Sequence, residues 1–195
     1  MAAINPQKIA GNWRAGVALD IHTLSSTHLG TNEHGHPIFD TKRSELGELL
    51  NRLKYHADQK VVPEIVETAV TFLKPHRSKF DVIVPVPPSA VRAVQPVILL
   101  AEGIGAGLGL PVVSCITTTR DTKQLKEVTD PAQRKELLDG LHAVDASKTK
   151  GRNILLFDDL FRSGATMNAI TDILKQTGGA ASVRVFTITR TRSNR

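Results

Sequence analysis

Short apolar runs rich in β-branched residues recur along the second half of the chain, separated by stretches with helical character. The runs occupy residues 81–86, 112–116, 153–157 and 182–188. Strands that are apolar on both faces are typical of parallel sheets covered by helices. Helices are expected at residues 93–104 and 165–176, the second followed by two glycines that favour a helix end. The alternation predicts a doubly wound α/β fold with a mainly parallel sheet, and ligands are expected beyond the carboxyl ends of its strands.

Two further helices are expected before this alternation. The first carries leucines at i, i+3, i+4 and i+7, which are Leu46, Leu49, Leu50 and Leu53. Asp40 or Thr41 is its candidate cap. The second has Pro63 in its first turn and Pro75 at its end.

The polar N-terminal part of the chain has a different pattern. Residues 13–24 alternate loosely, as a strand does, and residues 25–36 have the composition of a loop or hairpin tip. We therefore divide the chain into a small N-terminal hood at residues 1–45 and an α/β domain at residues 46–195.

Composition narrows the class of protein. Of 195 residues, 41% are hydrophobic and 23% are charged, as in a globular domain. The chain contains no run of about 18 apolar residues, and residues 1–10 lack the apolar region of a secretory signal. Its one cysteine, Cys115, supports neither a disulfide framework nor a thiolate zinc site. We expect a cytoplasmic protein without a membrane segment.

The charge balance points to anionic ligands. There are 25 basic and 19 acidic residues, which gives a net charge of +6. Such a balance favours phosphorylated metabolites or nucleic acid without choosing between them. Aromatic residues make up only 4% of the chain, so platforms for stacking bases are scarce. Arg190, Arg192 and Arg195 are either a solvated tail or a weak nucleic-acid contact.

The most informative stretch is residues 154–166, with the sequence ILLFDDLFRSGAT. Four apolar residues predict a buried strand, and Asp158 and Asp159 follow them, placed to accept hydrogen bonds from the hydroxyls of a sugar. The next residues predict a tight turn into a helix, whose backbone N–H groups and hydroxyls would bind a phosphate. Its candidate phosphate ligands are Arg162, Ser163, Gly164, Ala165 and Thr166. The alternative is a solvated Asp pair followed by an ordinary capped helix.

This stretch resembles the phosphoribosyl diphosphate (PRPP) motif of the type I phosphoribosyltransferases, with Arg162 and Ser163 in place of the usual two threonines. The order of the remaining segments is similar to that of the ComF-like branch of the superfamily. The resemblance covers about residues 46–189. It implies Mg²⁺ as cofactor, held chiefly by PRPP oxygens, with no direct protein ligand and at most a water-mediated contact to Asp158 or Asp159.

Two other segments complete the predicted site. The strand at residues 81–86 ends in prolines, and a stiff bend there can present N–H groups to a leaving pyrophosphate. The candidate residues of this pyrophosphate loop are Pro87, Pro88, Ser89 and Arg92. Alternatively, the prolines only terminate the strand. Residues 117–138 form a long polar connection, and the resemblance implies a flexible loop that closes over PRPP, with Lys123, Gln124 and Arg134 as candidates. A solvated helix is the alternative here.

The sequence thus predicts a phosphoribosyltransferase that transfers the phosphoribosyl group of Mg-PRPP to an unidentified acceptor and releases pyrophosphate. The alternative is a non-catalytic PRPP-binding module that works with DNA-uptake or recombination proteins. A second copy of the chain is a further candidate partner. The sequence departs from the ComF-like pattern because it lacks the four cysteines of a zinc ribbon, so residues 1–45 would supply another hood.

Overall fold

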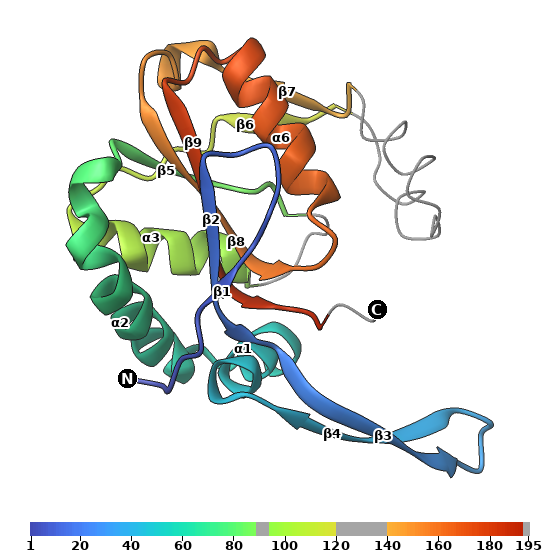
Figure 1. Cartoon of the computed structure of the whole chain (residues 1–195). Helices are drawn as coiled ribbons and strands as arrows, with labels where there is room; N and C mark the ends of the chain where they lie inside the picture. The colour runs from blue at the N-terminus through green and yellow to red at the C-terminus, as the bar shows by residue number, and fades with distance from the viewer. Residues whose placement is uncertain (89–93, 120–139, 193–195) are drawn as a thin grey trace.

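The computed structural model describes residues 1–88, 94–119 and 140–192, and its centre is a five-stranded sheet (Figure 1). The strand order is β1-β2-β9-β8-β5. The strands span Gln7–Lys8 (β1), Ala15–Ile21 (β2), Ser182–Arg190 (β9), Asn153–Phe161 (β8) and Val82–Pro85 (β5). β1 is antiparallel to β2, and the other neighbours are parallel. The predicted mainly parallel α/β fold is confirmed.

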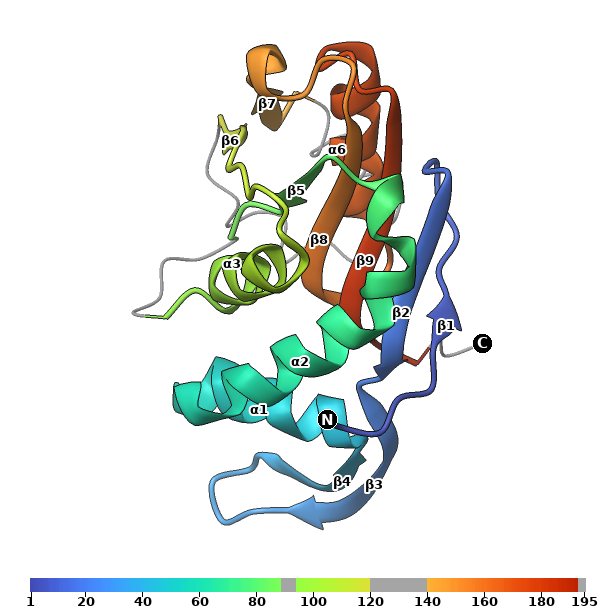
Figure 2. The ribbon, with the colours of Figure 1, turned by 90° about the vertical axis from the view of Figure 1, so that its left-hand side faces the viewer.

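Helices cover both faces of this sheet (Figure 2). They are α1 (Glu45–His56), α2 (Val62–Leu73), α3 (Pro96–Leu108) and α6 (Ala165–Gln176). Leucines of α1 share one apolar cluster with residues of α2 and α3, whereas Ile170 and Leu174 of α6 belong to a second cluster. The sheet therefore separates α1, α2 and α3 on one face from α6 on the other.

The predicted helix of four leucines is confirmed as α1, but its expected cap is wrong. Ser44 caps it, because its Oγ accepts the N–H of Gly47 at 3.0 Å. Asp40 and Thr41 lie instead in the strand β4 (Pro37–Arg43). Because β4 continues to Arg43, Ser44 is the first residue free to cap the helix.

Several predicted bounds need correction. The run at 112–116 forms only a bridge from Val112 to Ile83 and the first residue of the short strand β6 (Ile116–Thr118), which pairs with β7 (His142–Val144). Among the described residues, helix α3 starts at Pro96 rather than residue 93 and runs to Leu108. Short 3-10 helices occupy Gln59–Val61 (η1), Lys74–Lys79 (η2) and Ala146–Lys148 (η3).

The N-terminal part does not form the separate hood that was expected at residues 1–45. Strands β1 and β2 belong to the central sheet. The polar stretch predicted as a loop or tip is mostly strand: β3 (Thr23–Thr31) pairs with β4 in a hairpin. In Figures 1 and 2 this hairpin projects beyond α1, away from the sheet. The name hood is therefore given to the β3–β4 hairpin together with α1.

The described helices do not have the length and hydropathy of a bilayer span. None of those within residues 1–88, 94–119 and 140–192 is long and apolar enough to cross a membrane.

Candidate functional site

The turn that joins β8 to α6 leaves the start of the helix without a cap from a side chain. Gly164 occupies the N-cap position in a left-handed conformation, with φ of 79°. A Cβ atom there would lie 2.9 Å from Cζ of Phe161, so glycine is required for both conformation and space. Ser163 and Arg162 are exposed, and Ser163 Oγ accepts the N–H of Ala165 only at 3.5 Å. The N–H groups of the first turn of α6 are therefore available to an anion.

Asp158 and Asp159 lie within β8 rather than beyond its end. The strand was predicted to stop at residue 157, but Asp158 pairs with Thr187 and Leu160 pairs with Thr189, so the ladder continues to Phe161. Asp159 is buried, with 7% of its surface exposed, and Asp158 is half-buried. Both carboxyl groups thus belong to a rigid strand close to the turn.

The two carboxyl groups have different partners. Lys54 of α1 donates a hydrogen bond of 2.9 Å to Oδ1 of Asp159, and both side chains of this ion pair are nearly buried. The backbone N–H of Asp159 donates to Oδ1 of Asp158 at 2.9 Å. Asp159 therefore has its negative charge balanced by the hood, whereas Asp158 has no ion pair with any described residue.

This difference sets the protonation of the pair. Burial, with the negative charge of Asp159 as the next cause, raises the pKa of Asp158 to about 8. In the free protein Asp158 therefore holds a proton at neutral pH, and the pair carries one negative charge rather than two. Carboxyl groups with strongly raised pKa values are concentrated at functional sites.

Two residues near the carboxyl pair, Lys54 and His22, were not expected there from the sequence. His22 is half-buried, and its Nδ1 lies 3.0 Å from Oγ1 of Thr189. Burial lowers the pKa of His22, and the positive charges of Lys54 and Arg43 lower it further. The imidazole is therefore neutral at pH 7. Lys54 could have been suspected only from its position directly after the buried Leu53, near the end of an amphipathic helix.

Part of the predicted site can be followed in the structure. Residue Val86, after β5, donates its N–H to the carbonyl oxygen of Phe157 at 2.8 Å, so the chain enters the predicted pyrophosphate loop beside β8. Pro87 is half-buried and Pro88 is exposed. Ser89 and Arg92 of that loop, and Lys123, Gln124 and Arg134 of the predicted flexible loop, lie outside the described residues.

The donor set around the turn suits a magnesium complex of a diphosphate. Within the described parts of the chain, no cluster of three or more His, Cys, Asp or Glu side chains could hold a metal by itself. Mg²⁺ usually keeps several waters and is bound through substrate phosphates with one or two carboxylates nearby. The Asp158–Asp159 pair meets that requirement without a dedicated protein cage.

Comparison with known proteins gives a consistent family assignment. The family model described as "Phosphoribosyl transferase domain" matches residues 71–195. A competence protein, ComFC of Bacillus subtilis (strain 168), is 28% identical over 151 residues, which is 77% of this chain and 62% of that protein. The chain thus spans about three fifths of the length of this curated relative.

Among solved structures, one with a TM-score of 0.50 supports the fold, and a second is similar at a lower score. The structure described as the allosteric regulatory enzyme of purine biosynthesis has a TM-score of 0.50 and 17% identity, over 80% of this chain and 34% of that chain. The adenine phosphoribosyltransferase of Trypanosoma brucei, in complex with AMP, pyrophosphate and ribose-5-phosphate, has a TM-score of 0.48 and 16% identity, over 96% of this chain and 75% of that chain.

Proposed function

Because the chain belongs to the phosphoribosyl transferase domain family, we propose that it binds Mg-PRPP and transfers the phosphoribosyl group to an acceptor, with release of pyrophosphate. The single observation that supports this best is the uncapped start of α6 beside a pair of carboxyl groups on β8. The uncapped helix start suits a phosphate, and the carboxyl pair suits the hydroxyls of the sugar that carries this phosphate.

The turn binds the 5′-phosphate in this proposal. Backbone N–H groups from Gly164 onward face the phosphate oxygens, with the hydroxyls of Ser163 and Thr166 as further donors. The guanidinium of Arg162 is exposed and adds a positive charge that the usual threonine lacks. The partial positive charge at the start of α6 contributes in the same direction.

Asp158 and Asp159 hold the ribose. Asp159 keeps one oxygen on Lys54, and a carboxylate has further lone pairs that can accept a ribose hydroxyl. Asp158, protonated in the free protein, would release its proton to solvent when the substrate binds, since ribose hydroxyls and a bound Mg²⁺ would both favour the charged form. Bound Mg²⁺ would supply charge neutralisation on the diphosphate. The bond from C1 of the ribose to the pyrophosphate oxygen breaks with its electron pair leaving on oxygen, while a lone pair of the acceptor forms the new bond to C1.

The remaining roles follow the family resemblance. The predicted pyrophosphate loop faces the pyrophosphate in this proposal, with Pro87, Pro88, Ser89 and Arg92 as its residues. The predicted flexible loop closes over the bound substrate and contributes Lys123, Gln124 and Arg134. The same proposal includes that the protein acts in the cytoplasm.

Calorimetric titration with Mg-PRPP tests the proposal. Asp158→Asn and Asp159→Asn should each weaken binding by about 10- to 150-fold, because each removes a charge-assisted hydrogen bond of about 1.5 to 3 kcal/mol. Asp172→Asn is the matched control, since Asp172 is an exposed residue of α6 without a role in the site. Unchanged affinity in the Asp158→Asn, Asp159→Asn double variant would remove the carboxyl pair from the site.

A second candidate function is favoured by the similarity to a competence protein. In this alternative the chain binds PRPP without transferring it and acts together with DNA-uptake or recombination proteins. Release of pyrophosphate from PRPP, measured across a panel of nitrogenous bases and amines, separates the two. Steady release with any acceptor supports the transferase, and tight PRPP binding without release supports the binding module.

A further inference from the structure

Basic side chains gather at the amino end of the central sheet, whereas the proposed PRPP site lies at its carboxyl end. Four segments, each leading into one of the strands β2, β5, β8 and β9, form this end. They are residues 9–14, 74–81, 145–153 and 175–184. Figures 1 and 2 show them at the end of the molecule away from the β3–β4 hairpin. We call them together the amino-end surface.

The four segments are joined to one another by hydrogen bonds from N–H groups to carbonyl oxygens. These bonds run from the backbone of Arg14 to Val183 at 2.9 Å, from the backbone of Ala181 to Arg152 at 2.9 Å, and from Nη1 of Arg184 to Lys79 at 3.2 Å. The segments therefore form one continuous surface.

The amino-end surface carries the positive charge of the chain. Its segments contain nine Lys or Arg residues and two Asp residues, an excess of seven positive charges. The whole chain has a net charge of +6, so the rest of it is close to neutral. Six of the nine basic side chains are exposed, namely Arg14, Lys74, Lys79, Lys148, Lys150 and Lys175.

This positive charge is not neutralised within the described protein. None of the nine basic residues forms an ion pair with a described residue. The two acids are engaged locally, because Asp81 accepts the backbone N–H of Asn153 at 2.7 Å and Asp145 accepts that of Ser147 at 3.0 Å. An uncompensated surface of one sign attracts a partner with many charges of the other sign.

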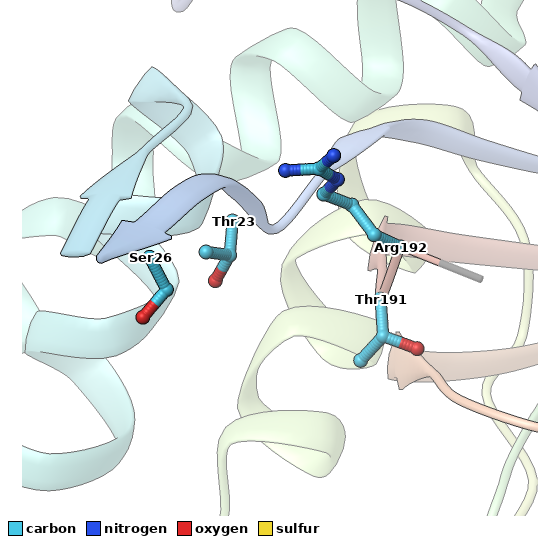
Figure 3. Close-up of a pocket in the computed structure, with 4 residues that line it drawn as sticks. All are labelled: Thr23, Ser26, Thr191 and Arg192. Atoms are coloured by element: carbon cyan, nitrogen blue, oxygen red, sulfur yellow. The ribbon is translucent and has the colours of Figure 1, made fainter. Parts of the chain in front are cut away.

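The carboxyl end of the sheet has a different character. A cavity of about 370 Å³ there, between the hood and the residues after β9, is lined by Thr23, Ser26, Thr191 and Arg192 (Figure 3). Only one of these four side chains is basic, and the carboxyl pair of β8 lies toward the same end of the sheet. The amino-end surface is therefore separate from the proposed PRPP site.

The composition of the amino-end surface favours one kind of polyanion. Trp13 and Phe80 are the only Phe, Trp or Tyr residues of its segments, and both are buried, so it offers no such ring on which the bases of a single strand could stack. The large apolar side chains that are exposed on the described protein all lie outside these segments, whereas binding to a membrane surface usually inserts such side chains. The phosphates of a duplex need only positive charge.

We propose that the amino-end surface binds the phosphate backbone of duplex DNA without regard to sequence. Neighbouring strands lie about 4.8 Å apart, so four strands span about 15 Å. A duplex carries a phosphate charge for about every 1.7 Å of its axis, and several phosphates therefore face the exposed lysines at once. This binding goes beyond the proposed function and does not depend on transfer of the phosphoribosyl group.

Fluorescence anisotropy with a short labelled DNA duplex of mixed sequence, measured over a range of salt concentrations, tests the inference. Lys79→Gln combined with Lys150→Gln should weaken binding by about tenfold or more at about 0.1 M salt, and should reduce the slope of log affinity against log salt by about 2, because each substitution removes one phosphate contact. Lys79→Arg combined with Lys150→Arg should keep the affinity. A duplex of unrelated sequence should bind equally well.

Lys42→Gln combined with Lys60→Gln is the matched control. It removes the same charge from exposed lysines of β4 and η1, away from the amino-end surface, and should change the affinity little. Equal weakening in the two double variants, or no duplex binding even at low salt, would overturn the inference.

The same assay decides between places and partners. Saturating ribose 5-phosphate should leave duplex binding unchanged, and displacement of the duplex would place the DNA on the phosphate turn instead. A single strand of the same length, polyglutamate and vesicles with an anionic lipid are measured in parallel. Tighter binding of any of these than of the duplex would refute the assignment to duplex DNA.

Discussion

Lys54 and Asp159 are 105 residues apart in sequence and form an ion pair of 2.9 Å, with only 13% and 11% of their side chains exposed. The pair joins α1 of the hood to the strand that carries the proposed ribose site. A buried pair of this kind adds little net stability compared with an apolar pair, but losing one partner leaves the other charge uncompensated. The ion pair therefore couples the hood to the sugar site.

Lys54→Met should lower the free energy of unfolding by about 3 kcal/mol, because Asp159 is then left without its counter-charge in a nearly buried position. Adding Asp159→Asn to Lys54→Met should restore most of that loss. Urea denaturation of the four proteins of this double-mutant cycle measures the coupling. Strictly additive effects of the two substitutions would show that the ion pair does not form in solution.

The raised pKa of Asp158 makes stability depend on pH in a defined direction. The folded protein holds this proton up to about pH 8, whereas the ordinary aspartate pKa of 3.8 describes the unfolded chain. The contribution of Asp158 to the free energy of unfolding is therefore complete below about pH 4. It is lost as the pH rises toward 8, and the free energy changes by at most about 1.4 kcal/mol per pH unit. Asp158→Asn removes this slope. The difference in unfolding free energy between wild type and Asp158→Asn should therefore fall from pH 5 to pH 8.

The control for this series is Asp172→Asn, which replaces an exposed carboxyl group of α6 outside the site and should leave the slope of Asp158 in place. His22 and His142 have pKa values lowered mainly by burial, so their contributions are lost as the pH falls, and they cancel in the comparison with Asp158→Asn. A flat difference from pH 5 to pH 8 would contradict the assignment of the bound proton to Asp158.

Gly164→Ala should remove binding of ribose 5-phosphate. The left-handed φ of 79° is strained by about 1 to 2 kcal/mol for any residue with a Cβ, and that atom would also contact the ring of Phe161. Gly109→Ala is the matched control, because Gly109 has a φ of 60° and nothing within 4 Å of the place where a Cβ would lie. Both variants should lose stability in a thermal melt, Gly164→Ala the more because only its Cβ meets a ring, and only Gly164→Ala should lose the ligand. Equal ligand affinity in the two variants would mean that the phosphate binds elsewhere.

Local patterns were enough to predict much of the fold. Helix α6 has the bounds that its glycines indicated, and the four leucines of α1 are all buried. The extent of β8 was underestimated, because a pair of acids usually ends a buried strand. Here the ladder from Asp158 to Thr187 and from Leu160 to Thr189 continues it. Pairing with the parallel strand β9 overrides the low intrinsic preference of the two aspartates for a strand.

The parts of the site that were missed depend on distant contacts. Strand β2 was expected from its alternation, but its place beside β9 in the central sheet was not, since nothing in residues 13–24 specifies a partner in residues 182–190. The contact of Lys54 with Asp159 was missed for the same reason, since nothing in the local sequence specifies the partner. It exists only because α1 packs on the face of the sheet to which Asp159 points.

Thr187 and Thr149 provide a final prediction about buried hydroxyls. Both residues are completely buried, but Thr149 Oγ1 donates to the carbonyl oxygen of Gly178 at 2.7 Å, whereas Thr187 Oγ1 has no hydrogen-bond partner among the described residues. Valine has nearly the same shape as threonine without the hydroxyl. Thr187→Val should therefore raise the free energy of unfolding by about 1 kcal/mol, because it removes the cost of an unsatisfied polar group.

Thr149→Val is the matched comparison and should lower the free energy of unfolding by about 1 to 3 kcal/mol, since it leaves the carbonyl group of Gly178 without its buried donor. Urea denaturation at one pH compares the two variants with wild type. Thr187 lies opposite Asp158 in the strand ladder, so Mg-PRPP affinity is measured on the same samples. A loss of stability in Thr187→Val would show that its hydroxyl has a partner in solution, and weaker Mg-PRPP binding with unchanged stability would place that hydroxyl in the ligand site.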